Sequence, residues 1–118
     1  MAKAEEGCLF CRIVNREVPS EIIWEDDEEI AIRDIRPQAP VHILLIPKRH
    51  IPGITQLSEE DKSLIGHIHV VATKFARDQS VFQCGSRLVA NSGPDAGQAI
   101  NHLHFHFLGG RKLGWPPG

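Results

Sequence analysis

The chain has 118 residues, a length that fits one domain, which we expect to span 1–118 and to have its own hydrophobic core. Its content of 42% hydrophobic and 24% charged residues excludes the compositions of disordered and fibrous proteins. A formal net charge of −2 excludes a broad basic surface for nucleic-acid backbones, so we expect no nucleic-acid partner, and any nucleotide that the protein binds should be small and held at a site.

The first elements in chain order are a polar stretch and a short helix. Residues 1–6 lack the apolar core of a secretory signal, so we expect them to be flexible and the protein to be cytoplasmic. In that compartment three cysteines favour thiols or metal ligands, and we expect Cys84 to be a buried or half-buried thiol. A short helix or turn within 8–15 is predicted from the spacing of Leu9, Phe10, Ile13 and Val14.

Three strands are predicted next. Residues 21–24 and 29–32 form a hairpin across the acidic turn 25–28. The prolines of 36–40 keep that segment outside a sheet. Residues 41–46 then form a β-branched strand, which we expect to be central. This apolar run is far shorter than the roughly 20 residues that cross a bilayer, so we expect no membrane partner.

A long amphipathic helix is predicted from an N-cap at Ser58 to about Asp78. The acidic residues 59–61 complement the helix dipole, and the apolar stripe should cover one face of the sheet. His67 and His69 lie on this helix without sharing a face, so we interpret both as structural or solvent-exposed.

The rest of the chain supplies a strand, a loop and a tail. Residues 86–91 form a predicted strand, and the three glycine and proline residues of the loop 92–99 exclude regular structure there. Residues 109–118 form an irregular tail. Strand pairs before and after one long helix favour an α+β fold with an antiparallel sheet over βαβ units.

The segment 102–106 alternates histidine with apolar residues, as a half-buried strand does. His102, His104 and His106 are then expected on one face. Histidine has an ordinary pKa of about 6.5, so much of it is neutral and nucleophilic at pH 7. A histidine-rich surface strand is the alternative, but three imidazoles in register favour chemistry.

Two further motifs carry chemical meaning. In the loop 91–99, Gly93 and Gly97 allow backbone N–H groups to approach an anion, although a plain connection needs no ligand. Cys8 and Cys11 form a Cys-x-x-Cys pair, which with two histidines would complete a structural zinc site. Two thiols without a metal are an equal alternative, and a redox role is weaker because no βαβ pattern surrounds the pair.

Together these segments resemble the histidine-triad family, and within it the nucleotide-binding branch that hydrolyses purine nucleoside phosphoramidates. The resemblance covers 7–118. It rests on 8–12, on the Asp-Ile-Arg-Pro-Gln-Ala-Pro-Val-His run 34–42, on Gly97 and Gln98, on 102–106, on 108–111 and on the Trp-Pro-Pro-Gly sequence 115–118. It implies an antiparallel sheet of about five strands with one long and one short helix. It also implies a homodimer paired through the long helix and a strand edge, in which the tail approaches the partner's site.

The resemblance further implies two-step nucleotidyl transfer. His104 would attack the α-phosphorus and form a nucleotidyl-histidine that water hydrolyses, while a backbone carbonyl holds its other ring nitrogen. His106 and His42 would flank the phosphate, and Gln98 would complete the catalytic group. Asn91, Gly97, Gln98 and Ala99 would contact phosphate or ribose-side oxygens.

The nucleoside would lie beside this group. Asp34 would accept hydrogen bonds from the ribose hydroxyls, and Trp115 in the tail would lie near the site. An apolar slot for the base would be lined by five residues, each with an equally good interpretation as ordinary core: Leu9, Phe10, Ile13, Ile32 and Ile35.

The resemblance also bears on the metal. Members with the cysteine pair are similar to galactose-1-phosphate uridylyltransferase, which implies a structural Zn²⁺ on Cys8, Cys11, His50 and His102; a structural strand position for His102 competes with this. Catalysis would require no cofactor. One departure concerns Ala99, where eukaryotic members usually carry serine, and it predicts slower turnover.

The expected function is therefore hydrolysis of a purine nucleoside phosphoramidate with release of a nucleoside monophosphate such as AMP. Dinucleoside polyphosphate hydrolysis or nucleotidyl transfer by the same histidine is the enzymatic alternative. An AMP-binding regulatory module and a structural domain with a metal on the histidine row are alternatives of other classes.

Overall fold

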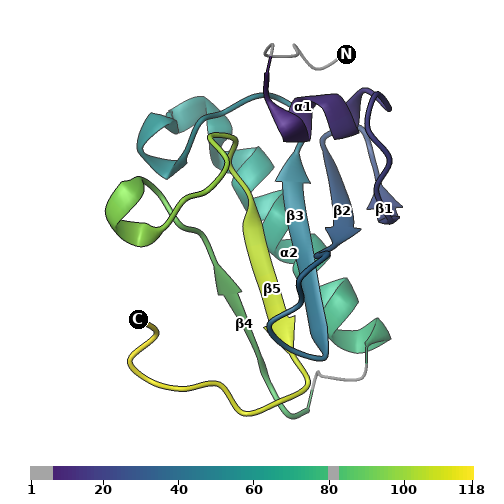
Figure 1. Cartoon of the computed structure of the whole chain (residues 1–118), viewed down its shortest axis with the longest axis vertical. Helices are drawn as coiled ribbons and strands as arrows, with labels where there is room; N and C mark the ends of the chain where they lie inside the picture. Colours follow the sequence, from purple (N-terminus) through teal and green to yellow (C-terminus); the bar gives the residue numbers. More distant parts are fainter. Residues whose placement is uncertain (1–6, 80–82) are drawn as a thin grey trace.

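Five antiparallel strands form one sheet in a computed structural model that describes residues 7–79 and 83–118. The predicted flexibility of 1–6 concerns residues outside this part. The strands are β1 (Ile22–Glu25), β2 (Glu29–Arg33), β3 (Val41–Pro47), β4 (Ser86–Val89) and β5 (Phe105–Gly109), in the order β1-β2-β3-β5-β4 (Figure 1). The predicted α+β fold is confirmed, and β3 is the central strand.

Two helices cover opposite faces of this sheet. The long helix α2 (Lys62–Asp78) packs on the face that carries Ile43, Leu45 and Phe107, and these side chains form the larger core. The short helix α1 (Leu9–Val14) packs with Phe10 and Ile13 on the other face (Figure 1). Alternate residues of β3 therefore enter different cores, as the period of a strand requires.

The long helix begins three residues later than predicted, because α2 starts at Lys62 with Asp61 as its N-cap, and Ser58 instead caps the 3₁₀ turn before it. A 3₁₀ turn, η2 (Glu59–Asp61), precedes α2, because the Asp61 N–H donates to the Ser58 carbonyl (3.0 Å) and tightens the first turn. The Asp61 carboxylate accepts a hydrogen bond from the Ser58 N–H (2.8 Å) and pairs with Arg49. The predicted end at Asp78 is confirmed.

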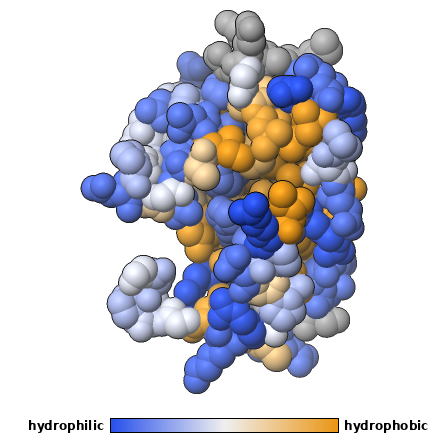
Figure 2. Space-filling view, in the orientation of Figure 1, coloured by the Kyte–Doolittle hydropathy of each residue, from blue (hydrophilic) through white to orange (hydrophobic). Residues whose placement is uncertain are grey.

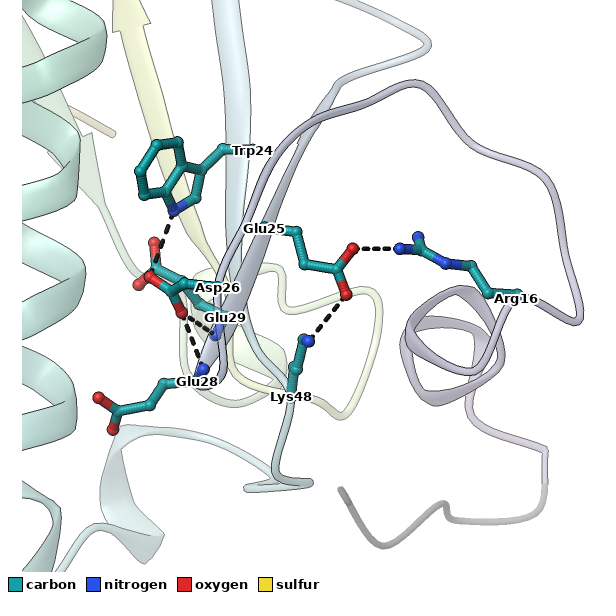
Figure 3. Close-up of polar contacts among 7 residues, drawn as sticks. All are labelled: Arg16, Trp24, Glu25, Asp26, Glu28, Glu29 and Lys48. Carbon is teal, nitrogen blue, oxygen red and sulfur yellow. Dashed lines mark hydrogen bonds and ion pairs between the residues drawn. The ribbon is translucent and has the colours of Figure 1, made fainter.

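The β1–β2 turn is held by carboxylates. Asp26 accepts hydrogen bonds from the backbone N–H groups of Glu28 (2.8 Å) and Glu29 (2.9 Å), which closes the turn (Figure 3). Its other oxygen contacts His67 Nε2 of α2 at 2.5 Å. The predicted structural role of His67 is thus confirmed, and His69 is exposed as expected. Outside the turn, Glu25 joins Arg16 to Lys48 (Figure 3).

The predicted strand 102–106 is wrong at its start. Regular pairing begins at Phe105, opposite Leu45, and continues to Gly109. The same register would place Leu103 opposite Pro47, which has no N–H to donate, so the ladder cannot extend there. His102 consequently leaves the sheet, and the expectation of three imidazoles on one face is wrong for that residue.

Three smaller expectations need correction. The strand predicted over 86–91 ends at Val89, and the loop after it contains one 3₁₀ turn, η3 (Pro94–Ala96). Cys84 is exposed, because it lies in the turn that enters β4. Within 7–79 and 83–118, no helix is long and apolar enough to cross a membrane.

Candidate active site

Two histidines of adjacent strands meet on the sheet face that carries α1. His42 of β3 and His106 of β5 lie two pairing positions apart, on the same face of the sheet, and His42 Nε2 is 2.9 Å from His106 Nδ1. The Asp34 carboxylate lies 3.4 Å from His42 Nε2. Sheet register thus assembles Asp34, His42 and His106, which are distant in sequence.

Hydrogen bonds to the backbone assign the protons in this group. The Gln38 N–H donates to His42 Nδ1 (3.0 Å), so neutral His42 carries its proton on Nε2. That proton is donated to His106 Nδ1, which places the proton of His106 on Nε2. Burial lowers the pKa of His42, and burial followed by the neighbouring His104 and His42 lowers the pKa of His106 to about 4. Both rings are therefore neutral at pH 7.

The middle histidine has the opposite tautomer. His104 Nδ1 donates to the carbonyl of His102 (2.7 Å), which is the carbonyl contact predicted from the sequence. Its Nε2 is therefore left with a free lone pair. His104 is 8% exposed, and burial lowers its pKa despite the carbonyl contact and Asp34. This geometry prepares Nε2 to act as a nucleophile.

Helix α1 supports this arrangement from above the sheet. The ring of Phe10 contacts His104 edge-on, with centroids 4.9 Å apart, and contacts His102 with centroids 5.9 Å apart. Phe10 is 3% exposed. One side chain of α1 therefore packs against two successive histidines of the triad.

A second cluster lies at the N-terminal end of α1. Cys8 is the N-cap, Cys11 lies on the buried side, and both sulfurs face the rings of His50 and His102. The four candidate ligand atoms, Cys8 Sγ, Cys11 Sγ, His50 Nδ1 and His102 Nδ1, all lie within 4.8 Å of one another. Four contacts among them measure 3.2 to 3.5 Å.

This cluster fits a tetrahedral zinc ion. Zn–S bonds of about 2.3 Å and Zn–N bonds of about 2.0 Å separate the ligand atoms by roughly 3.3 to 3.8 Å. His102 Nε2 donates to the Pro47 carbonyl (2.7 Å), so its Nδ1 lone pair faces the sulfurs. Such a backbone contact is the usual outer partner of a zinc-bound histidine.

Asp34, His42 and His106 also place three candidate ligand atoms within 4.8 Å. Their protonation argues against a metal there. Because the Gln38 N–H occupies His42 Nδ1, a metal on Nε2 would have to displace the proton that His42 shares with His106. The three residues are better described as a hydrogen-bonded chain.

The glycine-containing loop places its predicted residues in different surroundings. Asn91 lines the same cavity as His42 and His106. Gln98 holds the loop together, since its side-chain carbonyl accepts from the Gly93 N–H (2.9 Å) and its amide donates to the Pro52 carbonyl (2.6 Å). Gly97 has φ of 79°, and Ala99 is exposed beside Leu9. The predicted phosphate contacts stay predictions.

The apolar residues predicted for the base divide into two groups. Phe10, Ile13 and Ile32 are buried in the core beneath α1. Leu9 and Ile35 are 41% and 91% exposed, and Figure 2 shows apolar surface over α1 and the strands beside it. Trp115 is 82% exposed.

Sequence reasoning missed three contributors to the site. The Gln38 N–H fixes the tautomer of His42, and the Arg111 guanidinium holds the Gln38 carbonyl (2.9 Å). Arg87 of β4 lines the cavity beside His106. The four-residue spacing between Gln38 and His42 is the one sequence signal for the contact of the Gln38 N–H. The positions of Arg111 and Arg87 depend on long-range packing.

Comparisons with known proteins agree with this geometry. Residues 7–113 match the family described as "Scavenger mRNA decapping enzyme C-term binding". An uncharacterized HIT-like protein of Synechococcus elongatus is 45% identical over 113 residues, which are 96% of this chain and 98% of that protein. The chain belongs to the histidine-triad (HIT) family. Its five-stranded sheet with one long and one short helix is the HIT fold.

Solved HIT structures superpose closely on this chain. A HIT family hydrolase from Legionella pneumophila has a TM-score of 0.93 and 45% identity, and the match covers 95% of this chain and 100% of that one. A histidine triad protein from Clostridium difficile has a TM-score of 0.91 and 40% identity, covering 95% and 97%. The relatives therefore support a HIT hydrolase in general, without fixing the bond that is cleaved.

Proposed function

We propose that this HIT protein hydrolyses purine nucleoside phosphoramidates through a nucleotidyl intermediate on His104 and releases a nucleoside monophosphate such as AMP. The observation that carries the proposal is the tautomer of His104, whose Nδ1 donates to the His102 carbonyl (2.7 Å). Its Nε2 then attacks without first losing a proton.

The first step forms a bond from His104 Nε2 to the α-phosphorus and breaks the phosphorus–nitrogen bond. The departing nitrogen takes the electron pair and needs a proton. The proton comes from solvent, because His106 is a neutral imidazole and would become an anion if it gave up its Nε2 proton. Its ring centroid is 5.2 Å from that of His104, so its Nε2–H can donate a hydrogen bond to the phosphate oxygens. In the second step water attacks phosphorus, its proton is released to solvent, and His104 leaves.

The nucleoside is proposed to lie over α1 and β2. Asp34 lies at the end of β2, where its carboxylate can accept the ribose hydroxyls in place of the present 3.4 Å contact with His42. Leu9 and Ile35 offer apolar surface to the base above the buried Phe10. Burial of an aromatic base there would be favoured by the hydrophobic effect.

Trapping of the intermediate tests the proposal. The protein is mixed with adenosine 5′-phosphoramidate, quenched in milliseconds to seconds and analysed by mass spectrometry of peptides. We expect an adenylyl group on the peptide containing His104, and its loss in His104→Ala with an unchanged circular dichroism spectrum. His69→Ala, at an exposed position on α2, is the matched control. Absence of any adduct with turning-over enzyme would refute the mechanism.

We also propose a structural zinc ion on Cys8, Cys11, His50 and His102. The donor chemistry and the 3.2 to 3.5 Å contacts support it. Elemental analysis of the purified protein should find close to one zinc per chain, and Cys11→Ser should lose it. Cys84→Ser is the control, because this exposed cysteine lies outside the cluster. Purified protein without zinc that keeps full stability would refute this part.

The proposal includes a cytoplasmic homodimer. No disulfide joins the three cysteines in the described part of the chain, which suits a reducing compartment. Among the described residues, β4 lies at one edge of the sheet, where it pairs with β5, and Val70 of α2 is 67% exposed. Together they offer an unpaired strand edge and an apolar helix position for a second copy.

A further inference from the structure

A cavity of about 510 Å³ opens beside His106, on the side of the site away from α1. Its floor is the α1-side face of β4 and β5, and its walls are η3 and the C-terminal tail. Figure 2 shows the surface hollowed between that tail and the loop that carries η3. His42, His106 and Asn91 line it, so it is continuous with the proposed catalytic group.

Two guanidinium groups give this cavity its charge. Arg87 and His42 both pair with Leu108 across β5, so their side chains share one row of the sheet face. Arg111 lines the opposite wall, where its Nε donates to the Gln38 carbonyl (2.9 Å). No carboxylate is among the described residues that line the cavity. The unbalanced charge therefore favours an anion.

Sheet order places this cavity relative to the substrate. The order is β2-β3-β5-β4, with the proposed nucleoside over β2 and α1 and the histidines on β3 and β5. The cavity lies over β4, beyond the phosphate. The leaving group is attached to phosphorus on the side away from the nucleoside. It therefore extends toward the cavity over β4.

We propose that this cavity is the leaving-group subsite and that Arg87 selects leaving groups which carry an anion, either a carboxylate or a phosphate. This rests on the proposed function, because it names the second half of the same substrate. Arg111 keeps the Gln38 backbone in place, whereas the Arg87 guanidinium is free among the described contacts to pair with the ligand. Guanidinium groups bind both anions in a bidentate manner.

The chemical step balances with such a substrate. For an amino-acid phosphoramidate, the phosphorus–nitrogen bond breaks, the nitrogen takes a proton from solvent, and the carboxylate on Arg87 is unchanged. For a polyphosphate, the phosphorus–oxygen bond breaks and the departing phosphate keeps the electron pair. Neither route requires an oxidant or reductant.

Three adenosine 5′-phosphoramidates separate the alternatives: those of glycine, of glycinamide and of aminomethylphosphonate. We expect kcat/KM for the glycine compound to exceed that for the glycinamide compound about tenfold, since a charge-assisted pair is lost in the neutral amide. Arg87→Gln should bring this ratio close to one. Arg77→Gln, at the exposed end of α2, should keep it. The phosphonate compound shows which anion is preferred.

The preference of the subsite can also be tested by binding alone, without turnover of the substrate. In the His104→Ala background, calorimetry should show the glycine compound binding about tenfold more tightly than the glycinamide compound, and added Arg87→Gln should abolish the difference. Equal affinity for the glycine and glycinamide compounds overturns the proposed subsite. An equal loss of affinity for all three compounds in Arg87→Gln overturns it as well. Failure to form any His104 adduct, with the binding difference intact, instead refutes the proposed function alone.

Discussion

Three histidines of the site, His42, His102 and His104, are distinguished by the backbone group that each contacts. His104 and His102 donate to carbonyls through different nitrogens, Nδ1 in one ring and Nε2 in the other. His42 instead accepts from a backbone N–H. Three similar imidazoles thereby become a proposed nucleophile, a metal-ligand candidate and a proton-bearing neighbour, although their residue type alone does not separate them.

At the residue scale, Ala99→Ser should accelerate phosphoramidate hydrolysis. A hydroxyl at this position would supply a polar contact that the alanine lacks, and such contacts contribute up to about 10² to 10³ in rate. Steady-state kcat with adenosine 5′-phosphoramidate checks the gain. Ser63→Ala, at an exposed position on α2, serves as the control, and an unchanged kcat in Ala99→Ser would contradict the expectation.

A second residue-scale prediction concerns Glu29. This carboxyl is 0% exposed, and neither oxygen has a hydrogen-bond partner among the described residues. Burial, and then the charge of Asp26, raises its pKa from 4.5 to about 7, while His67 opposes the rise. The folded state therefore holds the proton more tightly than the unfolded state, which favours folding below pH 4.5.

That advantage is lost as pH rises from 4.5 to about 7, at a cost of about 3 kcal/mol. We expect the free energy of unfolding of the native protein to fall by this amount relative to Glu29→Gln across the interval. Urea denaturation at several pH values measures the difference, and Glu28→Gln is the exposed control. Buried histidines such as His106 contribute with the opposite sign, so only the difference between the curves isolates Glu29. Parallel curves would contradict the prediction.

At the scale of elements, the start of α2 depends on one carboxylate. Asp61 is 6% exposed and accepts from the Ser58 N–H (2.8 Å). Asp61→Ala leaves that N–H without its acceptor and leaves Arg49 without its partner, so it should lower the free energy of unfolding by about 1 to 2 kcal/mol. Thermal unfolding of the native protein and of Asp61→Ala measures this loss of stability. Glu60→Ala, one residue earlier and exposed, should change stability by under about 0.5 kcal/mol; equal losses would contradict the assignment.

At the scale of the whole molecule, the dimer is open to a direct test. Val70→Glu places a charge on the exposed face of α2, and we expect it to halve the mass measured by sedimentation equilibrium. A charge buried between two subunits without a partner is strongly unfavourable. Lys62→Glu, at the exposed start of the same helix, should leave the mass unchanged. A monomeric native protein would contradict the proposed assembly.

The sequence predicts most of the fold because local spacing determines which segments become helices and strands. It places the end of α2 correctly and the strands of the β1–β2 hairpin within one residue, although it places the start of α2 three residues early. It misplaces the start of β5, since that limit depends on Pro47, which is distant in sequence. Arg87 was overlooked for the same reason: only the register across β5 brings it into the row of His42.

The contact of Phe10 with both His102 and His104 has a consequence for how activity assays are interpreted. If zinc holds Cys8 and Cys11, its removal releases α1 and with it the ring that supports the nucleophile. Inactivation by a chelator would then follow the slow loss of helical signal, and recovery on adding zinc would follow refolding. A chelator would then abolish activity, as it does in a metalloenzyme, although the proposed chemistry uses only histidines.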